Sequence, residues 1–306
     1  SFHELVDSPW MASANLQHGT YAVDQTDFHV WFHGNVVPDW PKVLDDFTRF
    51  SEVQLQMMGG LPVREYHFLI LALPYTFYHG VEHLSSTVLA LGPAGQLMES
   101  PRYEDLTGVA SHELFHVWNI KAIRPLDMLP YDYSAENYSR LGFVYEGVTT
   151  YYGDLFLVRS GVYSHEQYLM ELDLRLQKHF ATHARFNMPV ADASFDTWLD
   201  GYVPGIPHRK TSIYDEGSLV ALMTDLLIRR STQNKASLDD VMRALYNDFG
   251  KRNIGYTESD YLNLVGQVAG MPMADFFADY VYGTENYEPL LRELLDYVGC
   301  ELTRNS

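Results

Sequence analysis

The sequence predicts an α+β protein in which a β-rich part comes first and a helical part follows. Two observations predict this order. Runs of aromatic and branched residues bounded by Gly and Pro occupy the first hundred residues, as is typical of strands. After about Pro101, apolar residues recur at helical spacing between capping residues.

Three strands are expected in the first part, at residues 27–32, 66–73 and 86–91. Between the first two, apolar residues recur at helical spacing from Trp40 to Met58, and the glycine pair Gly59-Gly60 predicts the end of that helix. The β-rich part therefore contains at least one long helix.

Capping residues predict the helices of the second part. Ser164 with Gln167, and Ser237 with Asp240, have the spacing of a capping box at a helix N-terminus. Three later helices are expected to end near glycines, at Gly250, Gly270 and Gly299. The sequence shows no internal repeat and no low-complexity linker.

Composition limits the classes of function. The 306 residues are 46% apolar, enough for a sizeable core, and no run approaches the roughly 18 apolar residues of a membrane span. The formal net charge of −19 argues against nucleic acid as a partner, because phosphate contacts need clustered Lys and Arg. The single cysteine, Cys300, excludes an internal disulfide and a Cys-based zinc site. The N-terminus lacks a secretory-signal pattern, which leaves the compartment open.

The sequence Ser111-His112-Glu113-Leu114-Phe115-His116 contains the pattern His-Glu-x-x-His. On a helix, residues i and i+4 lie on one face, so His112 and His116 can reach one metal ion, while Glu113 can reach a water molecule beside it. The alternative interpretation is a pair of solvated or core histidines, since five-residue patterns also arise by chance. The pattern predicts a zinc site with Glu113 as its general base.

A catalytic zinc ion usually has three protein ligands, and Glu146 is the candidate for the third. It lies thirty residues after His116, among apolar residues that would not surround a solvated surface charge. Prolines in the intervening stretch predict a chain reversal between two antiparallel helices. Five other histidines lack partner spacing and are interpreted as surface or loop residues: His79, His165, His179, His183 and His208. His83 is expected near the substrate.

At these residues the sequence resembles the glycyl aminopeptidase family of zinc metallopeptidases, a branch of the gluzincins related to aminopeptidase N. The resemblance extends through five blocks, which are residues 112–125, 146–155, 193–198, 212–222 and 237–241. It implies a thermolysin-like catalytic fold with a bound Zn²⁺ ion. It also implies a remnant of a preceding β domain at 1–35, a β-rich lobe at 36–100 and a helical zinc-binding lobe at 101–306.

The resemblance assigns further roles. Gly80-Val81-Glu82-His83 is similar to the family's Gly-Gly-x-Glu-His block, which implies that Gly80 and Glu82 bind substrate and that Glu82 holds a free amino terminus. Tyr214 is similar to the tyrosine of a Tyr-x-Lys-Gly block, which implies a hydrogen bond to the reaction's oxyanion. The lysine of that block is replaced here by Glu216, which alters the charge balance near the site.

The expected function is hydrolysis of the N-terminal peptide bond of peptides with a free amino terminus, and the resemblance implies a preference for small first residues such as Gly or Ala. Two alternatives stay open. In an endopeptidase Glu82 would be structural and the cleft open at both ends. A non-catalytic scaffold would retain the fold, although the intact Glu113 argues against it.

Overall fold

A computed structural model of the chain describes residues 2–200 and 206–303, which form two compact units. Unit 1 consists of Ser1–Lys121 and Tyr152–Glu171, and unit 2 of Ala122–Tyr151 and Leu172–Ser306. At two places the chain passes from one unit to the other inside a helix, in α4 (Thr149–Ser160) and in α5 (His165–Ala181). Neither unit is therefore a continuous segment of the chain.

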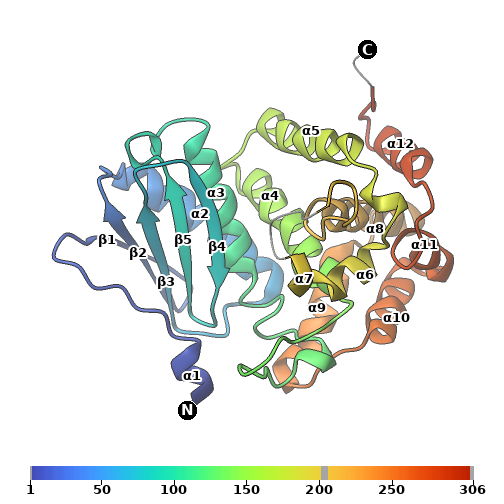
Figure 1. Cartoon of the computed structure of the whole chain (residues 1–306), viewed down its shortest axis with the longest axis horizontal. Coiled ribbons are helices and arrows are strands. Elements are labelled where there is room, and N and C mark those ends of the chain that lie inside the picture. Colours follow the sequence, from blue (N-terminus) through green and yellow to red (C-terminus); the bar gives the residue numbers. More distant parts are fainter. Residues whose placement is uncertain (1, 201–205, 304–306) are drawn as a thin grey trace. The chain divides into compact units, whose positions relative to one another are not determined.

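Unit 1 is built on one five-stranded sheet (Figure 1). Its strands in sheet order are β1 (Gln17–Val23), β2 (Thr26–Gly34), β3 (Glu65–Ala72), β5 (Ser86–Gly92) and β4 (Phe77–Glu82). The central pairs β2–β3 and β3–β5 are parallel, and the outer pairs β1–β2 and β4–β5 are antiparallel. Strand β4 is therefore an edge strand.

The three predicted strands are confirmed as β2, β3 and β5, whereas β1 and β4 were not predicted. The two missed strands are the edges of the sheet. Most of their residues are exposed or half-buried, so they carry little of the continuous apolar signal of a central strand.

The helices of unit 1 are α1 (Phe2–Val6), α2 (Trp40–Met58), the 3-10 turn η1 (Ala94–Gln96), α3 (Arg102–Phe115), most of α4 and the first part of α5. Helix α2 has the predicted bounds. The Asp39 side chain accepts a hydrogen bond from the Lys42 amide at its start, and Gly59 ends it in the left-handed conformation with φ 82°.

The core of unit 1 lies between the sheet and the helices α2 and α3. Alternate residues of β2 and β3 are fully buried, among them Phe28, Val30, Tyr66 and Phe68. The ring of Phe47 in α2 packs edge-on against that of Phe68, with 4.9 Å between centroids. This alternation is what a sheet with one buried face requires.

Unit 2 is helical. After the α4 and α5 segments, its elements are η2 (Leu126–Met128), the π-helix η3 (Phe143–Val148), η4 (Ala184–Phe186), α6 (Val190–Phe195), α7 (Thr197–Asp200), α8 (Asp215–Thr232), α9 (Leu238–Asp248), η5 (Gly250–Arg252), α10 (Glu258–Ala269), α11 (Ala274–Tyr280) and α12 (Glu288–Tyr297). Helix α8 is buried on all sides from Glu216 to Ile228, so it forms the centre of this unit.

The predicted caps are confirmed. The Ser164 amide and the Gln167 side chain are 2.9 Å apart, and the reciprocal contact is 3.1 Å. Ser237 and Asp240 form a capping box at the start of α9.

The fold class agrees with the prediction. The structure combines one five-stranded sheet with many helices, and every described strand lies before residue 93. Among the described helices, none has both the length and the apolar character needed to cross a membrane.

Candidate active site

Helix α3 positions His112 and His116 on one face. Its apolar residues Leu106, Ala110 and Leu114 are fully buried, which fixes the rotation of the helix. The Nε2 atoms of the two histidines then lie 3.0 Å apart. Two nitrogens bound to one tetrahedral zinc ion would be roughly 3.3 Å apart, given Zn–N distances of about 2.0–2.1 Å. The pair is therefore spaced to share one ion.

The tautomer of His116 is set by its second ring nitrogen. Nδ1 of His116 lies 2.7 Å from the carbonyl oxygen of Asn119. A carbonyl oxygen can only accept a hydrogen bond, so Nδ1 carries the proton and the Nε2 lone pair is directed toward His112. A backbone carbonyl in this position is the usual outer partner of a metal-binding histidine. Sequence reasoning missed this role of Asn119, because a backbone acceptor has no residue signature.

Glu113 lies beside the two imidazoles. The ligand atoms of His112, Glu113 and His116 all lie within 4.8 Å of one another, and no other such group of three occurs among the described residues. Glu113 is only 4% exposed. A set of imidazole and carboxylate donors on a buried helix fits a zinc ion, which also accounts for the burial of so many polar atoms together.

Edge strand β4 runs past this carboxylate. A Cβ atom added to Gly80 would lie 2.7 Å from Cδ of Glu113 and 2.8 Å from Cγ2 of Val109. Only glycine therefore admits the Glu113 side chain at this distance from the strand. Glu82 ends the same strand and is half-buried. The structure brings Gly80 into contact with Glu113, as part of unit 1.

Tyr66 of β3 contacts the backbone of Glu113. Its hydroxyl donates a hydrogen bond to the Glu113 carbonyl oxygen at 3.3 Å. Burial, together with the charges of Glu113 and Glu82, raises the pKa of Tyr66 well above its ordinary value. The Tyr66 hydroxyl therefore keeps its proton and donates to the Glu113 backbone.

A polar chain through three helices fixes the start of the His-Glu-x-x-His segment. The Ser111 hydroxyl donates to the Gly153 carbonyl at 2.8 Å, and Nε2 of Gln54 donates to the Ser111 carbonyl at 2.9 Å. A Cβ atom on Gly153 would lie 3.3 Å from Cα of His112. Gln54 was not predicted, since a Gln in a long helix carries no signal of its own.

The remaining predicted residues, Glu146 and Tyr214, lie in unit 2. Glu146 is in the π-helix η3, a type of helical segment found frequently at functional sites. Tyr214 is the residue before α8. The two elements meet where Gly147 faces Gly217, so closely that a Cβ atom on Gly147 would lie 2.6 Å from Cα of Gly217. Gly147, next to Glu146 in the sequence, is thus in contact with Gly217, three positions after Tyr214.

The interpretation of His179 as a surface or loop residue is wrong. His179 lies in α5, is 0% exposed and places Nδ1 2.9 Å from both carboxylate oxygens of Glu216. Sequence spacing could not show this, because the two residues are 37 positions apart. Glu216, which replaces the lysine of the resembled block, thus has a hydrogen-bonding partner inside unit 2.

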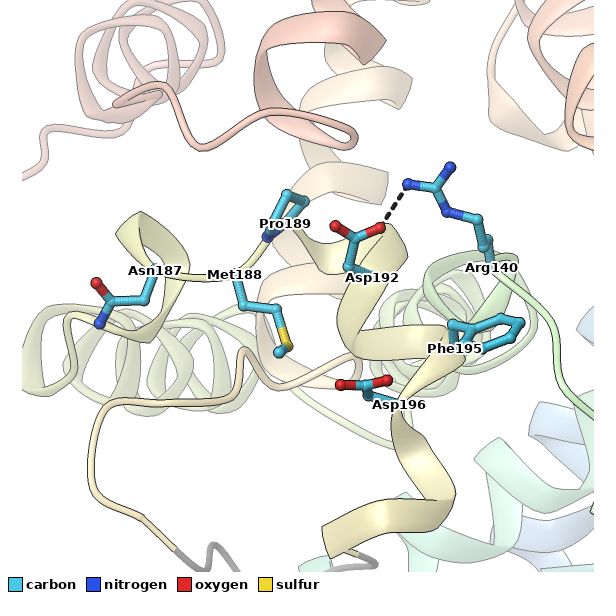
Figure 2. A pocket seen from close by; sticks show the side chains of 7 residues that line it. All are labelled: Arg140, Asn187, Met188, Pro189, Asp192, Phe195 and Asp196. Carbon is cyan, nitrogen blue, oxygen red and sulfur yellow. Dashed lines mark hydrogen bonds and ion pairs between the residues drawn. The ribbon is translucent and has the colours of Figure 1, made fainter.

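An open pocket of about 570 Å³ in unit 2 contains part of the block at residues 193–198 (Figure 2). Phe195 and Asp196 line it together with Asp192, which pairs with Arg140 at 2.5 Å. Both partners of this ion pair are at least 40% exposed. None of the predicted site residues lines this pocket.

The geometry agrees with the comparisons with known proteins. Residues 105–220 match the model of the M61 glycyl aminopeptidase family. This match confirms the family resemblance predicted from the sequence. This match includes His112, Glu113, His116, Glu146 and Tyr214.

A solved structure with a similar fold is the crystal structure of an aminopeptidase N family protein from Idiomarina loihiensis. The two chains are 29% identical, with a TM-score of 0.86 over 92% of this chain. This chain spans only 49% of the length of that protein. No curated protein sequence matches the chain.

Proposed function

We propose that the chain is a zinc-dependent aminopeptidase that hydrolyses the N-terminal peptide bond of its substrates. The observation that carries the proposal is the approach of His112 and His116 to 3.0 Å beside the buried Glu113. The M61 glycyl aminopeptidase family match and the aminopeptidase N family neighbour support the same chemistry.

The proposed ligands are His112, His116 and Glu146, in a thermolysin-like gluzincin arrangement. The lobes of that arrangement would be residues 36–100 and 101–306, after a remnant of a preceding β domain at 1–35. When bound, zinc would polarise the scissile carbonyl and lower the pKa of a water molecule toward about 7. The protonated Nδ1 of His116 supports its role as a ligand through Nε2.

The chain's own residues handle the proton and the charge. In the proposed mechanism, Glu113 takes a proton from the attacking water and delivers it to the leaving amine. Gly80 leaves the space in which the Glu113 carboxylate lies. The Tyr214 hydroxyl donates a hydrogen bond to the developing oxyanion, an interaction of about 2.7–4 kcal/mol for comparable donors.

Glu82 is proposed to bind the substrate's α-ammonium group. Strand β4 is an edge strand of the sheet, and an extended peptide can add to such an edge as another strand. A carboxylate at the end of such a strand would stop the peptide at its amino terminus, because a desolvated ammonium group needs a charged partner. The family's description as glycyl aminopeptidases supports a preference for a small first residue, Gly or Ala.

An endopeptidase is the second candidate. The exposed aromatic side chains Phe77 and Tyr78 on β4 favour it, because they would offer a longer peptide apolar surface at the start of this strand. A scaffold without activity would have no use for Glu113 between two imidazoles.

The test is turnover of glycyl and alanyl amides by zinc-loaded protein, compared with amino-acetylated peptides. We expect hydrolysis of the free-amino substrates that disappears with a chelator and returns with zinc. Efficient cleavage of acetylated peptides at internal bonds would support the endopeptidase instead. No stoichiometric zinc and no turnover of either substrate would refute both enzymes.

A further inference from the structure

Glu216, in the first turn of α8, has a buried carboxylate. Its side chain is 4% exposed, and it contacts two other buried residues, His179 of α5 and Tyr287 at the start of α12. Both of its oxygens are 2.9 Å from Nδ1 of His179, and the Tyr287 hydroxyl donates to Oε2. The same hydroxyl lies 3.0 Å from Nδ1 of His179. These three residues form one closed cluster.

The cluster accounts for its own burial. A carboxylate removed from water is tolerated only when hydrogen bonds or an opposite charge compensate it. Burial, followed by the charge of Glu216, raises the pKa of Tyr287 well above its ordinary value, so its hydroxyl stays a donor. Nε2 of His179 has no hydrogen-bond partner among the described residues, so the contact with Glu216 is what explains this buried imidazole.

A second set of contacts fixes the same turn of α8. Asp215 pairs with Lys178 of α5 at 3.2 Å and lies 3.9 Å from Arg175. The Asp215 amide donates to the Ser212 hydroxyl at 3.1 Å. Acidic residues also interact favourably with a helix N-terminus. Helix α5 therefore contacts two successive residues of α8. Its contact with Glu216 is buried, and its contact with Asp215 is partly exposed.

Tyr214 precedes these two residues directly. Its carbonyl accepts a hydrogen bond from the Ser218 amide at 2.9 Å, so its backbone is part of the fixed turn. We propose that Glu216, His179 and Tyr287 are positioning residues, which hold the first turn of α8 so that the Tyr214 hydroxyl reaches the oxyanion. This inference rests on the proposed function, in which Tyr214 is the oxyanion donor. A donor displaced by about 1 Å loses much of its effect on the transition state.

The experiment is a double-mutant cycle in the zinc-loaded protein. Tyr287→Phe removes one hydroxyl, and Glu216→Gln keeps the shape of the side chain without its charge. Each is made in the wild type and in Tyr214→Phe, and kcat and KM are measured on a glycyl amide. Val265→Ala, at a fully buried residue of α10 that makes none of the cluster's hydrogen bonds, is the control for loss of stability alone.

We expect Tyr287→Phe to lower kcat about tenfold in the wild type, with KM changed less than twofold. In the Tyr214→Phe background, where kcat is already on the order of 10²-fold lower, it should cause no further loss. Amide hydrogen exchange in residues 216–218 should accelerate in Tyr287→Phe but not in Val265→Ala.

Three other outcomes would each contradict the positioning role. If Tyr287→Phe and Glu216→Gln leave kcat unchanged while Tyr214→Phe lowers it, the positioning role is wrong and the proposed function stands. Equal losses in both backgrounds would show that the cluster acts only through stability. If Tyr214→Phe itself has no effect on kcat, the role of Tyr214 in the proposed function fails, and the positioning role fails with it.

Discussion

Gly80 and Glu113 are packed so closely that the strand has no room for a side chain at position 80. A Cβ atom there would lie 2.7 Å from Cδ of Glu113. The base proposed for hydrolysis and the strand proposed to bind substrate are therefore in direct contact.

Substitution of Gly80 should impair catalysis more than stability. Gly80→Ala forces the Glu113 carboxylate to move, because the other neighbour, Val109, belongs to the same buried helix. We expect kcat to fall at least tenfold, given that small displacements of a catalytic group have large effects. Gly95→Ala is the control, since no atom lies within 4 Å of a Cβ at that position. Wild-type kcat in Gly80→Ala would contradict the role of this contact.

Different substitutions should remove metal binding and proton transfer. His116→Ala removes a proposed ligand, so elemental analysis should find less than stoichiometric zinc. Glu113→Gln retains both imidazoles and should keep the zinc, while kcat/KM falls by about 10²-fold or more through loss of the base. Wild-type turnover in Glu113→Gln would show that another group accepts the proton.

Glu82 should determine the requirement for a free amino terminus. Glu82→Ala removes the proposed partner of the ammonium group, so kcat/KM on a glycyl amide should fall by about tenfold or more, with zinc content unchanged. Glu65→Ala, which removes a carboxylate 67% exposed at the start of β3, should have little effect. Internal cleavage of an acetylated peptide, equally fast in wild type and Glu82→Ala, would decide against an aminopeptidase.

Asp7 should contribute to stability above pH 4 and lose that contribution in acid. Burial alone would raise its pKa, but the contact with His83, the hydrogen bonds from Lys121 and the Leu84 amide, and the Lys121 charge lower the pKa from 3.8 to about 2. Because the folded-state pKa is the lower one, the stabilisation is complete above pH 4 and disappears as the pH falls through about 2.

Denaturant unfolding of wild type and Asp7→Asn measures this contribution. The two proteins should differ by on the order of 2 kcal/mol at pH 6, and the difference should shrink as the pH approaches 2. A difference that does not depend on pH would assign the effect to packing. Lys121 is 2.7 Å from Asp7 with a side chain 5% exposed, so solvent screens the pair little.

Local signals explain what could be predicted. Helix α2 was predicted with its observed bounds because Trp40 to Met58 has helical periodicity and Gly59 ends it in a conformation that glycine favours. His112 and His116 were paired correctly because they are four positions apart on one helix. Strands β1 and β4 were missed because edge strands bury too few residues to produce a periodic signal.

The sequence by itself determined the His-Glu-x-x-His segment, the helix caps and the family resemblance, since each depends on residues close in the chain or on recognisable blocks. Only the tertiary structure decided the contacts of Gly80 with Glu113 and of His179 with Glu216 and Tyr287. It also decided the hydrogen bond between the Asn119 carbonyl and His116. Backbone acceptors and cross-helix pairs carry no sequence period. They arise from packing, which brings together residues as far apart as the 71 positions between Glu216 and Tyr287.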